Sequence, residues 1–261
     1  DGSQISAKLR WEFAPENTGY HSALSAHYRK DDNDNTESGA DTGGTTGERI
    51  ELNWTGFYTM DNWDFAGGVE YLQRLFTQRG PIAFGDPNQK QHDNTYSVFA
   101  ETNGQLTESL TATLSARFDN NSEFDNAVSY RGGLTWQLND YYAVFTSYGK
   151  AVKTPTFTER FGYFPASFIG NPNLEPETSE EWEIGVKANW KSLSAQISAY
   201  TTDLEDEING FVFVSDLGAY SADNIDGESS REGIDLELNW DSGYGDFTAA
   251  YSYLDAEQTD N

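Results

Sequence analysis

Cysteine is absent from the sequence, and basic residues are scarce. The 261 residues include 16 Lys and Arg against 43 Asp and Glu, which gives a formal net charge of -27. The lack of cysteine excludes a disulfide framework and a thiolate metal site. With so few positive charges, the chain has no basic surface that could displace counterions from phosphates, so nucleic acid is not expected as a partner.

Long hydrophobic runs are missing as well. The densest apolar runs, at residues 141–145 and 211–214, are short, whereas a membrane helix needs roughly 18 to 20 consecutive apolar residues. A helical membrane protein is therefore excluded. A membrane barrel is not, because its strands need apolar side chains only at every second position. Residues 1–4 contain no signal segment, so localisation must be argued from the body of the chain.

Apolar and polar residues alternate along the whole chain. The first segment, residues 5–13, reads ISAKLRWEF, with an apolar side chain at every second position. This period of two is typical of a strand with one apolar face. The pattern occurs twelve times, around residues 5–13, 20–28, 50–58, 63–71, 96–100, 110–118, 130–138, 141–148, 182–190, 193–199, 234–240 and 247–253. We therefore predict an all-β fold with twelve strands.

The connections between these segments alternate between short and long. Short turns are predicted at residues 14–19, 60–62, 103–104, 139–140, 191–192 and 241–245, and longer loops at 30–47, 77–94, 119–126, after 148 and up to about 229. Bacterial outer-membrane barrels have short periplasmic turns and longer extracellular loops. Greek-key crossovers of a soluble sandwich would break this rhythm. The pattern predicts a transmembrane antiparallel up-and-down β-barrel.

Tryptophan positions indicate the sidedness of this barrel. Six of the seven Trp residues, all except Trp182, lie beside a predicted short turn. Each also occupies one of the alternating apolar positions of its strand, which we call the apolar parity. Outer-membrane barrels place aromatic girdles at the bilayer interfaces, whereas a soluble core has no reason to sort Trp to one end. The six residues therefore mark the periplasmic edge. The opposite parity carries charges such as Lys8, Arg231 and Glu237 and is predicted to form a wet lumen wall.

Several motifs in the second half of the chain carry a resemblance to a known family. Residues 152–161 read VKTPTFTERF after a Tyr-Gly strand end, and residues 170–179 read GNPNLEPETS before the next strand. Further similar segments lie at 183–185, 230–238 and 251–256. In this order, over about residues 110–256, the motifs resemble the TonB-dependent receptor family.

The prolines of the second motif have a clear structural effect. Pro172 and Pro176 cannot donate hydrogen bonds to a strand ladder, and each restricts the residue before it. We expect a stiff, extended segment that leads the chain into the ninth strand. A role in shaping the barrel rim is favoured over direct contact with a ligand.

The resemblance implies a larger barrel than this chain can form. Barrels of the family have about 22 strands and are wide enough to need a plug in the lumen. On that basis, residues 1–261 form a partial β-barrel domain, about half of the whole. The plug domain, the N-terminal box that engages the energy-coupling protein TonB and the C-terminal strands are expected outside it. A free-standing twelve-stranded pore is the alternative.

Enzymatic motifs are not found in the sequence. There is no G-x-S-x-G, no P-loop and no H-E-x-x-H pattern, so an enzyme is not expected. His21 and His27 share the lumen parity of the second predicted strand; solvated side chains are favoured over a weak metal or haem contact. His92 falls in a predicted loop, without partners nearby.

An acidic segment in the first predicted long loop is a candidate calcium site. Its carboxylates are Asp31, Asp32, Asp34, Glu37 and Asp41. Calcium takes six to eight oxygen ligands, but the spacing does not match an EF-hand, so a mobile, solvated acidic loop is the favoured interpretation. The resemblance adds that some cobalamin receptors of the family use calcium in extracellular loops.

Six aromatic residues in the long loops are candidates for binding a ligand. Binding sites combine aromatic walls with a few polar groups; packing of loop against loop is an equally good interpretation. The residues are Phe161, Tyr163, Phe164, Phe168, Phe211 and Phe213.

Three functions follow from these observations. The first, implied by the resemblance, is TonB-dependent uptake of a scarce metal chelate, cobalamin or a ferric siderophore, across the bacterial outer membrane, with outer-membrane lipid around the barrel. The acidic lumen and loops would repel an anionic chelate, which favours cobalamin or a neutral siderophore. The second is a passive porin or structural barrel, which needs no plug. The third is a secreted carbohydrate-binding β-protein, which would be soluble without detergent.

Overall fold

The protein is almost entirely β-structure. The computed structural model describes residues 1–16, 18–82, 85–163 and 167–260. The helix is α1 (Phe157–Phe161), and the strands are β1 (Gly2–Phe13), β2 (Tyr20–Glu37), β3 (Ala40–Met60), β4 (Trp63–Arg79), β5 (Gln89–Thr107), β6 (Leu110–Asn121), β7 (Ala127–Gln137), β8 (Tyr142–Lys153), β9 (Glu177–Trp190), β10 (Leu193–Glu205), β11 (Ile208–Val214), β12 (Ala219–Asn224), β13 (Gly227–Asp241) and β14 (Asp246–Asp260).

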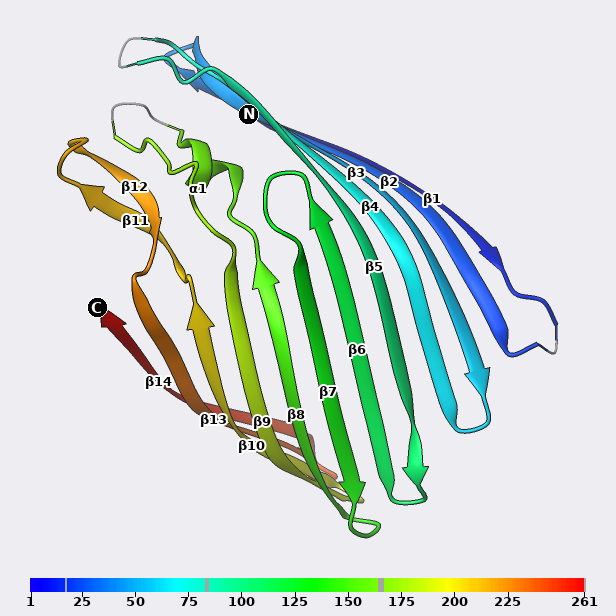
Figure 1. The fold of residues 1–261 in the computed structure, drawn as a ribbon. Coiled ribbons are helices and arrows are strands. Elements are labelled where there is room, and N and C mark those ends of the chain that lie inside the picture. Colours follow the sequence, from blue (N-terminus) through cyan, green and yellow to red (C-terminus); the bar gives the residue numbers. More distant parts are fainter. Residues whose placement is uncertain (17, 83–84, 164–166, 261) are drawn as a thin grey trace.

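Twelve strands form one antiparallel sheet, as predicted. They are hydrogen-bonded in chain order from β1 to β10 and continue with β13 and β14, while β11 and β12 form a separate two-stranded sheet. Figure 1 shows the large sheet as a curved wall, with the β11–β12 hairpin and α1 at its upper end. In the described part of the chain β1 and β14 are its two edges and do not pair with each other. The sheet is therefore open, and the alternative of a closed twelve-stranded pore is wrong.

The two ends of the wall differ in their connections. At the lower end of Figure 1 the strands are joined by residues 14–19, 61–62, 108–109, 138–141, 191–192 and 242–245. At the upper end they are joined by residues 38–39, 80–88, 122–126, 154–176 and 206–226, the last of which contain β11 and β12. The predicted alternation is therefore broken at one place, because residues 38–39 form a two-residue turn at the end with the long connections. The assignment of that end to the extracellular side stays a prediction.

The predicted loop at residues 30–47 is wrong. β2 and β3 continue side by side through most of it and turn at Ser38 and Gly39, which have φ angles of 51° and 80°. The sequence conceals this extension because neither face of the hairpin meets lipid there, so the apolar alternation that identifies a strand is lost. Backbone pairing alone still satisfies the amide groups.

The predicted turn at Asn103 and Gly104 is also wrong. β5 continues to Thr107, and the turn follows at residues 108–109. Gly104 lies opposite Trp63, and a Cβ atom at this position would lie 2.2 Å from the indole ring. The glycine is therefore required by the close approach of a ring to the strand rather than by a turn.

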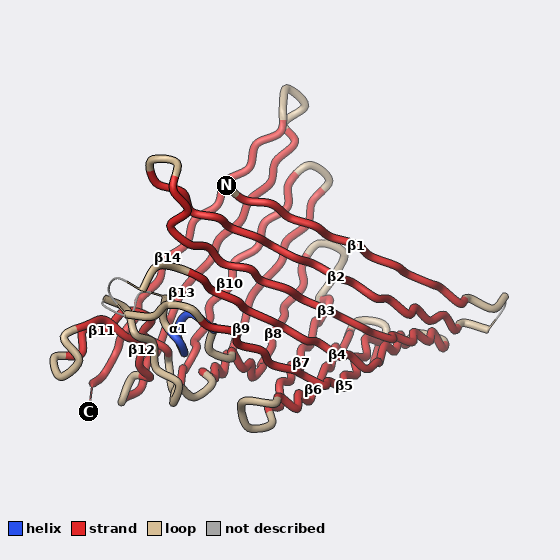
Figure 2. The backbone as a smooth tube through the Cα atoms, turned by 90° about the horizontal axis from the view of Figure 1, so that it is seen from above, coloured by secondary structure: helices blue, strands red, loops and turns tan. Residues whose placement is uncertain are grey.

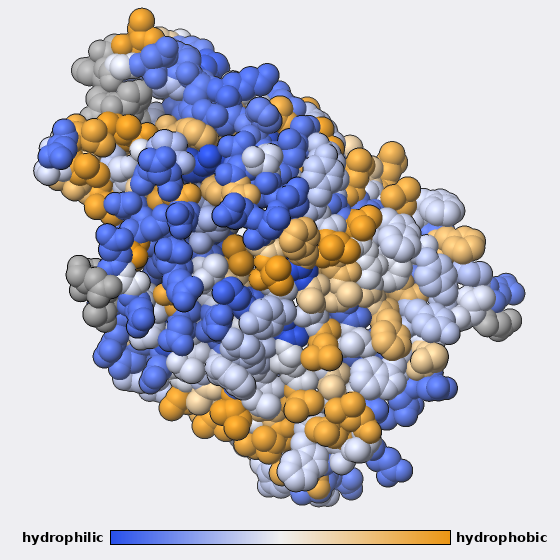
Figure 3. Space-filling model, viewed as in Figure 1, coloured by the Kyte–Doolittle hydropathy of each residue, from blue (hydrophilic) through white to orange (hydrophobic). Residues whose placement is uncertain are grey.

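One face of the wall carries the apolar side chains. Leu114 on β6 is 56% exposed and Ile184 on β9 is 59% exposed, although both are large and hydrophobic. Figure 3 shows hydrophilic side chains over the upper left of the molecule and most hydrophobic ones over the strands toward the lower right. An apolar surface of this extent needs a covering, and lipid covers the outer face of a membrane barrel. Among the described residues, no helix has the length and apolar character needed to cross a membrane.

Two rows of aromatic side chains border this outer face. Trp190 and the other tryptophans predicted for the lower edge lie toward the short turns. The upper row contains Tyr71 and Tyr96, with ring centroids 5.0 Å apart, and Tyr148 and Trp182, 4.6 Å apart. Trp182 thus belongs to the girdle at the loop end. The nine residues from Trp182 to Trp190 on β9 match the roughly 9 to 11 residues of a tilted transmembrane strand.

Candidate ligand-binding site

The inner face of the wall is polar, and several of its charges are paired. Arg117 on β6 donates hydrogen bonds to Glu70 (2.8 Å), Asp119 (2.9 Å) and the Ser97 hydroxyl (2.7 Å). Asp93 is only 2% exposed and is held by a salt bridge. A wall of hydrogen-bonded charges is compatible with water or a polar domain in the lumen, but not with hydrocarbon. The predicted polar inner face is confirmed, and water in the lumen stays a prediction.

The three histidines lie within the strands, where two of them contact neighbouring side chains. His27 lies between the Ser6 hydroxyl, at 3.0 Å, and Glu51, at 3.3 Å. His21 stacks on Phe57 with ring centroids 4.4 Å apart. His92 belongs to β5, opposite Leu75, and not to a loop as predicted. In the described ranges, no three His, Asp or Glu side chains gather in a way that could hold a metal ion.

The acidic segment forms part of a paired hairpin at the upper end of the wall. Asp31, Asp32, Asp34 and Glu37 lie on β2, and Asp41 lies on β3. The favoured prediction of a mobile acidic loop is therefore wrong, because both strands of the segment are hydrogen-bonded to each other. We define residues 30–47 as the hairpin extension.

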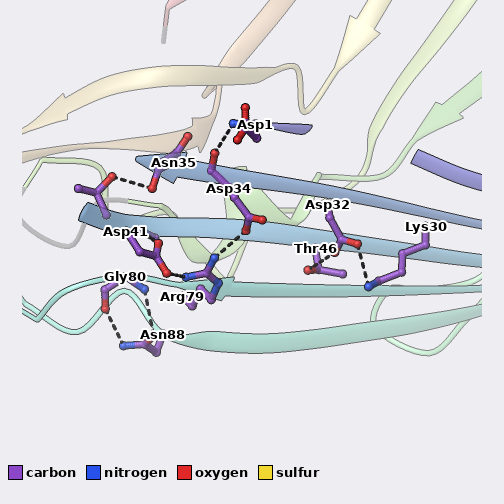
Figure 4. Close-up of polar contacts among 12 residues, drawn as sticks. Asp1, Lys30, Asp32, Asp34, Asn35, Asp41, Thr46, Arg79, Gly80 and Asn88 are labelled. Atoms are coloured by element: carbon purple, nitrogen blue, oxygen red, sulfur yellow. Dashed lines mark hydrogen bonds and ion pairs between the residues drawn. The ribbon is translucent and has the colours of Figure 1, made fainter. Parts of the chain in front are cut away.

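Cations on neighbouring positions neutralise several of these carboxylates. Arg79, the last residue of β4, contacts Asp41 at 2.5 Å and Asp34 at 2.6 Å, as Figure 4 shows. Asp31 pairs with Arg29 at 2.7 Å, and Asp32 with Lys30 at 2.8 Å. Arg79 thus fastens both strands of the hairpin extension to the end of β4.

The pKa values respond to these contacts. The pKa of the Asp41 carboxyl is lowered, first by the backbone N–H of Gly43 and then by Arg79. The pKa of Asp32 is lowered by hydrogen bonds from Lys30 and Thr46. Each of these carboxylates is therefore more readily ionised than a free one.

A second arginine joins two loops at the upper end. Arg160 in α1 is 7% exposed and lies between the rings of Phe124 and Phe161, each 4.8 Å from its guanidinium carbon. It also contacts Glu123 at 3.2 Å. Because Glu123 and Phe124 belong to the β6–β7 loop, Arg160 fixes the β8–β9 loop to its neighbour.

The proline-rich motif attaches to β12. The Glu175 backbone N–H donates to the Asn224 side chain at 2.8 Å, and the Asn224 amide donates back to the Glu175 carbonyl at 3.0 Å. Leu174 is 3% exposed and packs against Ile208 and Ala222. The motif therefore organises the loops, as the favoured prediction states.

Five aromatic rings from the two longest connections form a continuous group, which we name the aromatic stack. Successive centroids are 5.2 Å (Tyr163–Phe168), 6.0 Å (Phe168–Phe211), 4.1 Å (Phe211–Tyr220) and 5.3 Å (Phe213–Tyr220) apart. Figures 1 and 2 show the elements that carry it, near α1 and the β11–β12 hairpin.

Exposure divides the stack into two parts. Phe168 is 4% exposed and belongs to a buried cluster with Leu174, so it packs loop against loop. Phe211 is 59% exposed and Phe213 is 57% exposed, so both can contact a ligand. Packing of loop against loop is therefore confirmed for Phe168, whereas contact of Phe211 and Phe213 with a ligand stays a prediction.

The stack includes most, but not all, of the predicted residues. Phe161 lies apart and stacks on Phe157, with centroids 6.4 Å apart, and Phe164 is outside the described residues. Tyr220 was missed, although its ring contacts both Phe211 and Phe213. The signal that could have found it is the short hairpin pattern at residues 208–224, which the prediction treated as loop.

Comparisons with known proteins agree with this architecture. A family model described as TonB dependent receptor-like, beta-barrel, matches residues 1–261. The vitamin B12 transporter BtuB of Vibrio vulnificus (strain YJ016) is 33% identical over 178 residues, which cover 68% of this chain and 28% of that protein.

Solved structures share the fold. The siderophore receptor PirA from Acinetobacter baumannii has a TM-score of 0.77 at 21% identity, over 97% of this chain and 44% of its own. The ferric enterobactin receptor of Pseudomonas aeruginosa, in complex with enterobactin, has a TM-score of 0.80 at 14% identity, over 97% and 44%. The chain thus spans less than half of these relatives. It belongs to the TonB-dependent receptor family, whose transporters and receptors lie in the Gram-negative outer membrane, and it forms part of the β-barrel.

Proposed function

We propose that the parent protein imports a scarce metal chelate and that the aromatic stack contributes to capturing it. The observation that carries this proposal is the pair of exposed rings, Phe211 and Phe213, at the loop end of a barrel wall. Large ligands are bound by aromatic walls with few polar groups. Release into the periplasm would require the plug and TonB, which act through regions outside this chain.

Charge around the aromatic stack favours a ligand without net negative charge. Residues 206–226 contain five Asp and Glu and neither Lys nor Arg. In the other long connection, residues 154–176, the single basic residue is the buried Arg160. An anionic chelate would be repelled here, so we favour cobalamin or a neutral ferric siderophore. The related sequence named a vitamin B12 transporter supports the first.

Calcium in the hairpin extension is a separate proposal. A cation bound by Asp34 and Asp41 would have to displace Arg79, which now contacts both. Calorimetric titration with calcium up to millimolar concentration tests it, and the absence of any heat of binding would remove it.

Uptake by the full-length parent protein tests the transport proposal. Radiolabelled cyanocobalamin and a neutral ferric hydroxamate would be offered to cells that depend on this gene. We expect Phe211→Ala to weaken capture of the transported chelate about tenfold, because a buried aromatic face contributes about 1.5 kcal/mol or more. Tyr244→Ala is the matched control, since Tyr244 is 101% exposed in a turn at the opposite end. Unchanged uptake in Phe211→Ala, or no uptake of either chelate, would contradict the proposal.

A further inference from the structure

The outer face of the wall contains a groove with a floor of small residues. Gly56 on β3, Gly67 on β4, Ala100 on β5 and Ala116 on β6 lie opposite one another in successive strand pairs. All four belong to the lipid-facing parity. Because they lack large side chains, the outer face is hollowed here to a volume of about 660 Å³.

Large apolar side chains form the walls of this groove. Trp54 borders one side, and Tyr20, Tyr58, Phe65 and Leu114 contribute the rest. A Cβ atom at Gly56 would lie 3.3 Å from the Trp54 ring and 3.5 Å from the Tyr20 ring. The space therefore depends on glycine at this position.

Three polar residues also border the groove. Thr102 faces outward, and its hydroxyl donates a hydrogen bond to the Asp64 backbone carbonyl at 3.0 Å. The other two are Glu101 and Ser115. They alternate with Ala100 and Ala116 and so belong to the lumen parity. The side chains that the groove presents to the outside are therefore almost all apolar.

The groove runs obliquely from the periplasmic edge toward the middle of the membrane. Tyr58 and Phe65 lie two residues from the ends of β3 and β4, next to the turn at 61–62. Ala116 lies midway along β6. Its partner on β7 is Tyr130, whose ring centroid is 6.0 Å from that of Tyr148 in the upper aromatic row. Four strands separated by about 4.8 Å give a floor about 15 Å long.

Lipid is the medium that meets this face. β3 to β6 each have both neighbours in the sheet, as Figure 1 shows, so further strands of a larger barrel would not cover the groove. Within a bilayer, apolar groups associate with a protein surface through van der Waals packing and not through the hydrophobic effect, because the surrounding lipid is itself apolar. A hollow that stays unfilled loses these contacts, whereas a flexible hydrocarbon chain can fill it.

Charge at the periplasmic end points to one class of headgroup. Asp61 and Glu108 lie in the turns there, and residues 55–67 and 99–116 contain neither Lys nor Arg. An ammonium group is attracted to such a rim, and a headgroup with net negative charge is repelled. We propose that the groove holds one acyl chain of a zwitterionic, amine-bearing phospholipid of the periplasmic leaflet, with its headgroup beside Asp61 in the β3–β4 turn.

Native mass spectrometry of the full-length parent protein tests this proposal. The protein would be equilibrated in mild detergent with equal amounts of phosphatidylethanolamine and phosphatidylglycerol. We expect one retained phosphatidylethanolamine in the unmodified protein. The variant Ala100→Leu/Ala116→Leu fills the floor and should reduce retention about fivefold, the factor that corresponds to roughly 1 kcal/mol.

The control for this variant is Ala199→Leu. Ala199 also faces lipid, opposite Ile184 and Ile234, but lies away from the groove, so retention should not change. Asp61→Asn should keep the bound lipid and lower the preference for the amine headgroup about twofold.

Two results would overturn the proposal. One is equal retention in the unmodified protein, the filled variant and the control, which would show that bound lipid does not occupy the groove. The other is preferential retention of phosphatidylglycerol by the unmodified protein, a measurement that does not depend on whether any variant folds. Transport of the chelate is a separate readout, so failure of the lipid proposal leaves the proposed function untouched.

Discussion

At the scale of single residues, the face of the sheet to which a side chain points decides its environment. Leu114 and Ser115 are neighbours in β6, yet Leu114 points to lipid and Ser115 to the lumen side. The backbone and its hydrogen bonds are equivalent at the two positions. The same substitution should therefore have different costs at them, which makes the assignment of faces testable.

Arginine at the two positions provides this test. Leu114→Arg places a charge on the outer face and should destabilise the folded barrel by about 2 to 4 kcal/mol, as a charge near mid-bilayer does. Ser115→Arg places the same charge in a polar wall and should cost much less. Leu236, on the outer face of β13, should behave like Leu114. Denaturant unfolding in lipid vesicles measures the difference, and equal effects at all three positions would refute the register.

At the scale of elements, the hairpin extension shows that a strand can continue beyond the alternating apolar pattern by which it is recognised in the sequence. β2 and β3 contain 18 and 21 residues, more than a membrane crossing requires. Their upper parts are held by backbone pairing and by Arg79 instead of by apolar burial. The carboxylates near Arg79 are exposed, so the fastening depends on their charge.

Acid should loosen the hairpin extension. The pKa of Asp41 in the folded state is lowered by Gly43 and Arg79. The ionised carboxylate therefore stabilises the hairpin extension fully above the unfolded pKa of about 3.9. This stabilisation is lost as the pH falls through the lower pKa of the folded state. Hydrogen exchange of residues 30–47 should therefore show steady protection from pH 7 to about pH 5 and a decline below pH 4.

Arg79→Ala should reduce this protection at neutral pH as well, because both Asp34 and Asp41 lose their partner. Arg29→Ala is the matched control: Arg29 pairs with Asp31 within the same strand, so its loss should not free the hairpin extension from β4. Equal protection in Arg79→Ala and the unmodified protein would show that backbone pairing alone holds the extension.

The elements also show what sequence patterns can and cannot predict. Twelve strands, their order and their outer faces were predictable because lipid on one side and water on the other impose a strict period of two. The turn at Asn103 was predicted wrongly, since a glycine required by the Trp63 ring looks like a turn glycine. Tyr220 was missed because the hairpin pattern at residues 208–224 is short and interrupted by a register shift after Asn209. Arg79 was not recognised because its partners come from a different hairpin.

At the scale of the whole molecule, acidic residues greatly outnumber basic ones. The net charge of -27 arises from acids on the lumen wall, the hairpin extension and the long connections, while the outer band carries few charges. Most cations of the lumen wall and the extension are already paired with acids. An approaching ligand therefore meets a negative field over the loop end before it meets the aromatic stack.

Ionic strength should reveal this field in the rate of ligand capture. At about 10 mM salt the Debye length is about 30 Å, and at 150 mM it is about 8 Å. Binding of an anionic ferric chelate to the full-length protein should become several-fold faster over this range, because salt screens the repulsion. Binding of cyanocobalamin, which has no net charge, should change little. Stopped-flow fluorescence measures both rates; a slower rate for the anionic chelate at high salt would show that attraction by unpaired cations, and not repulsion by the acids, governs its approach.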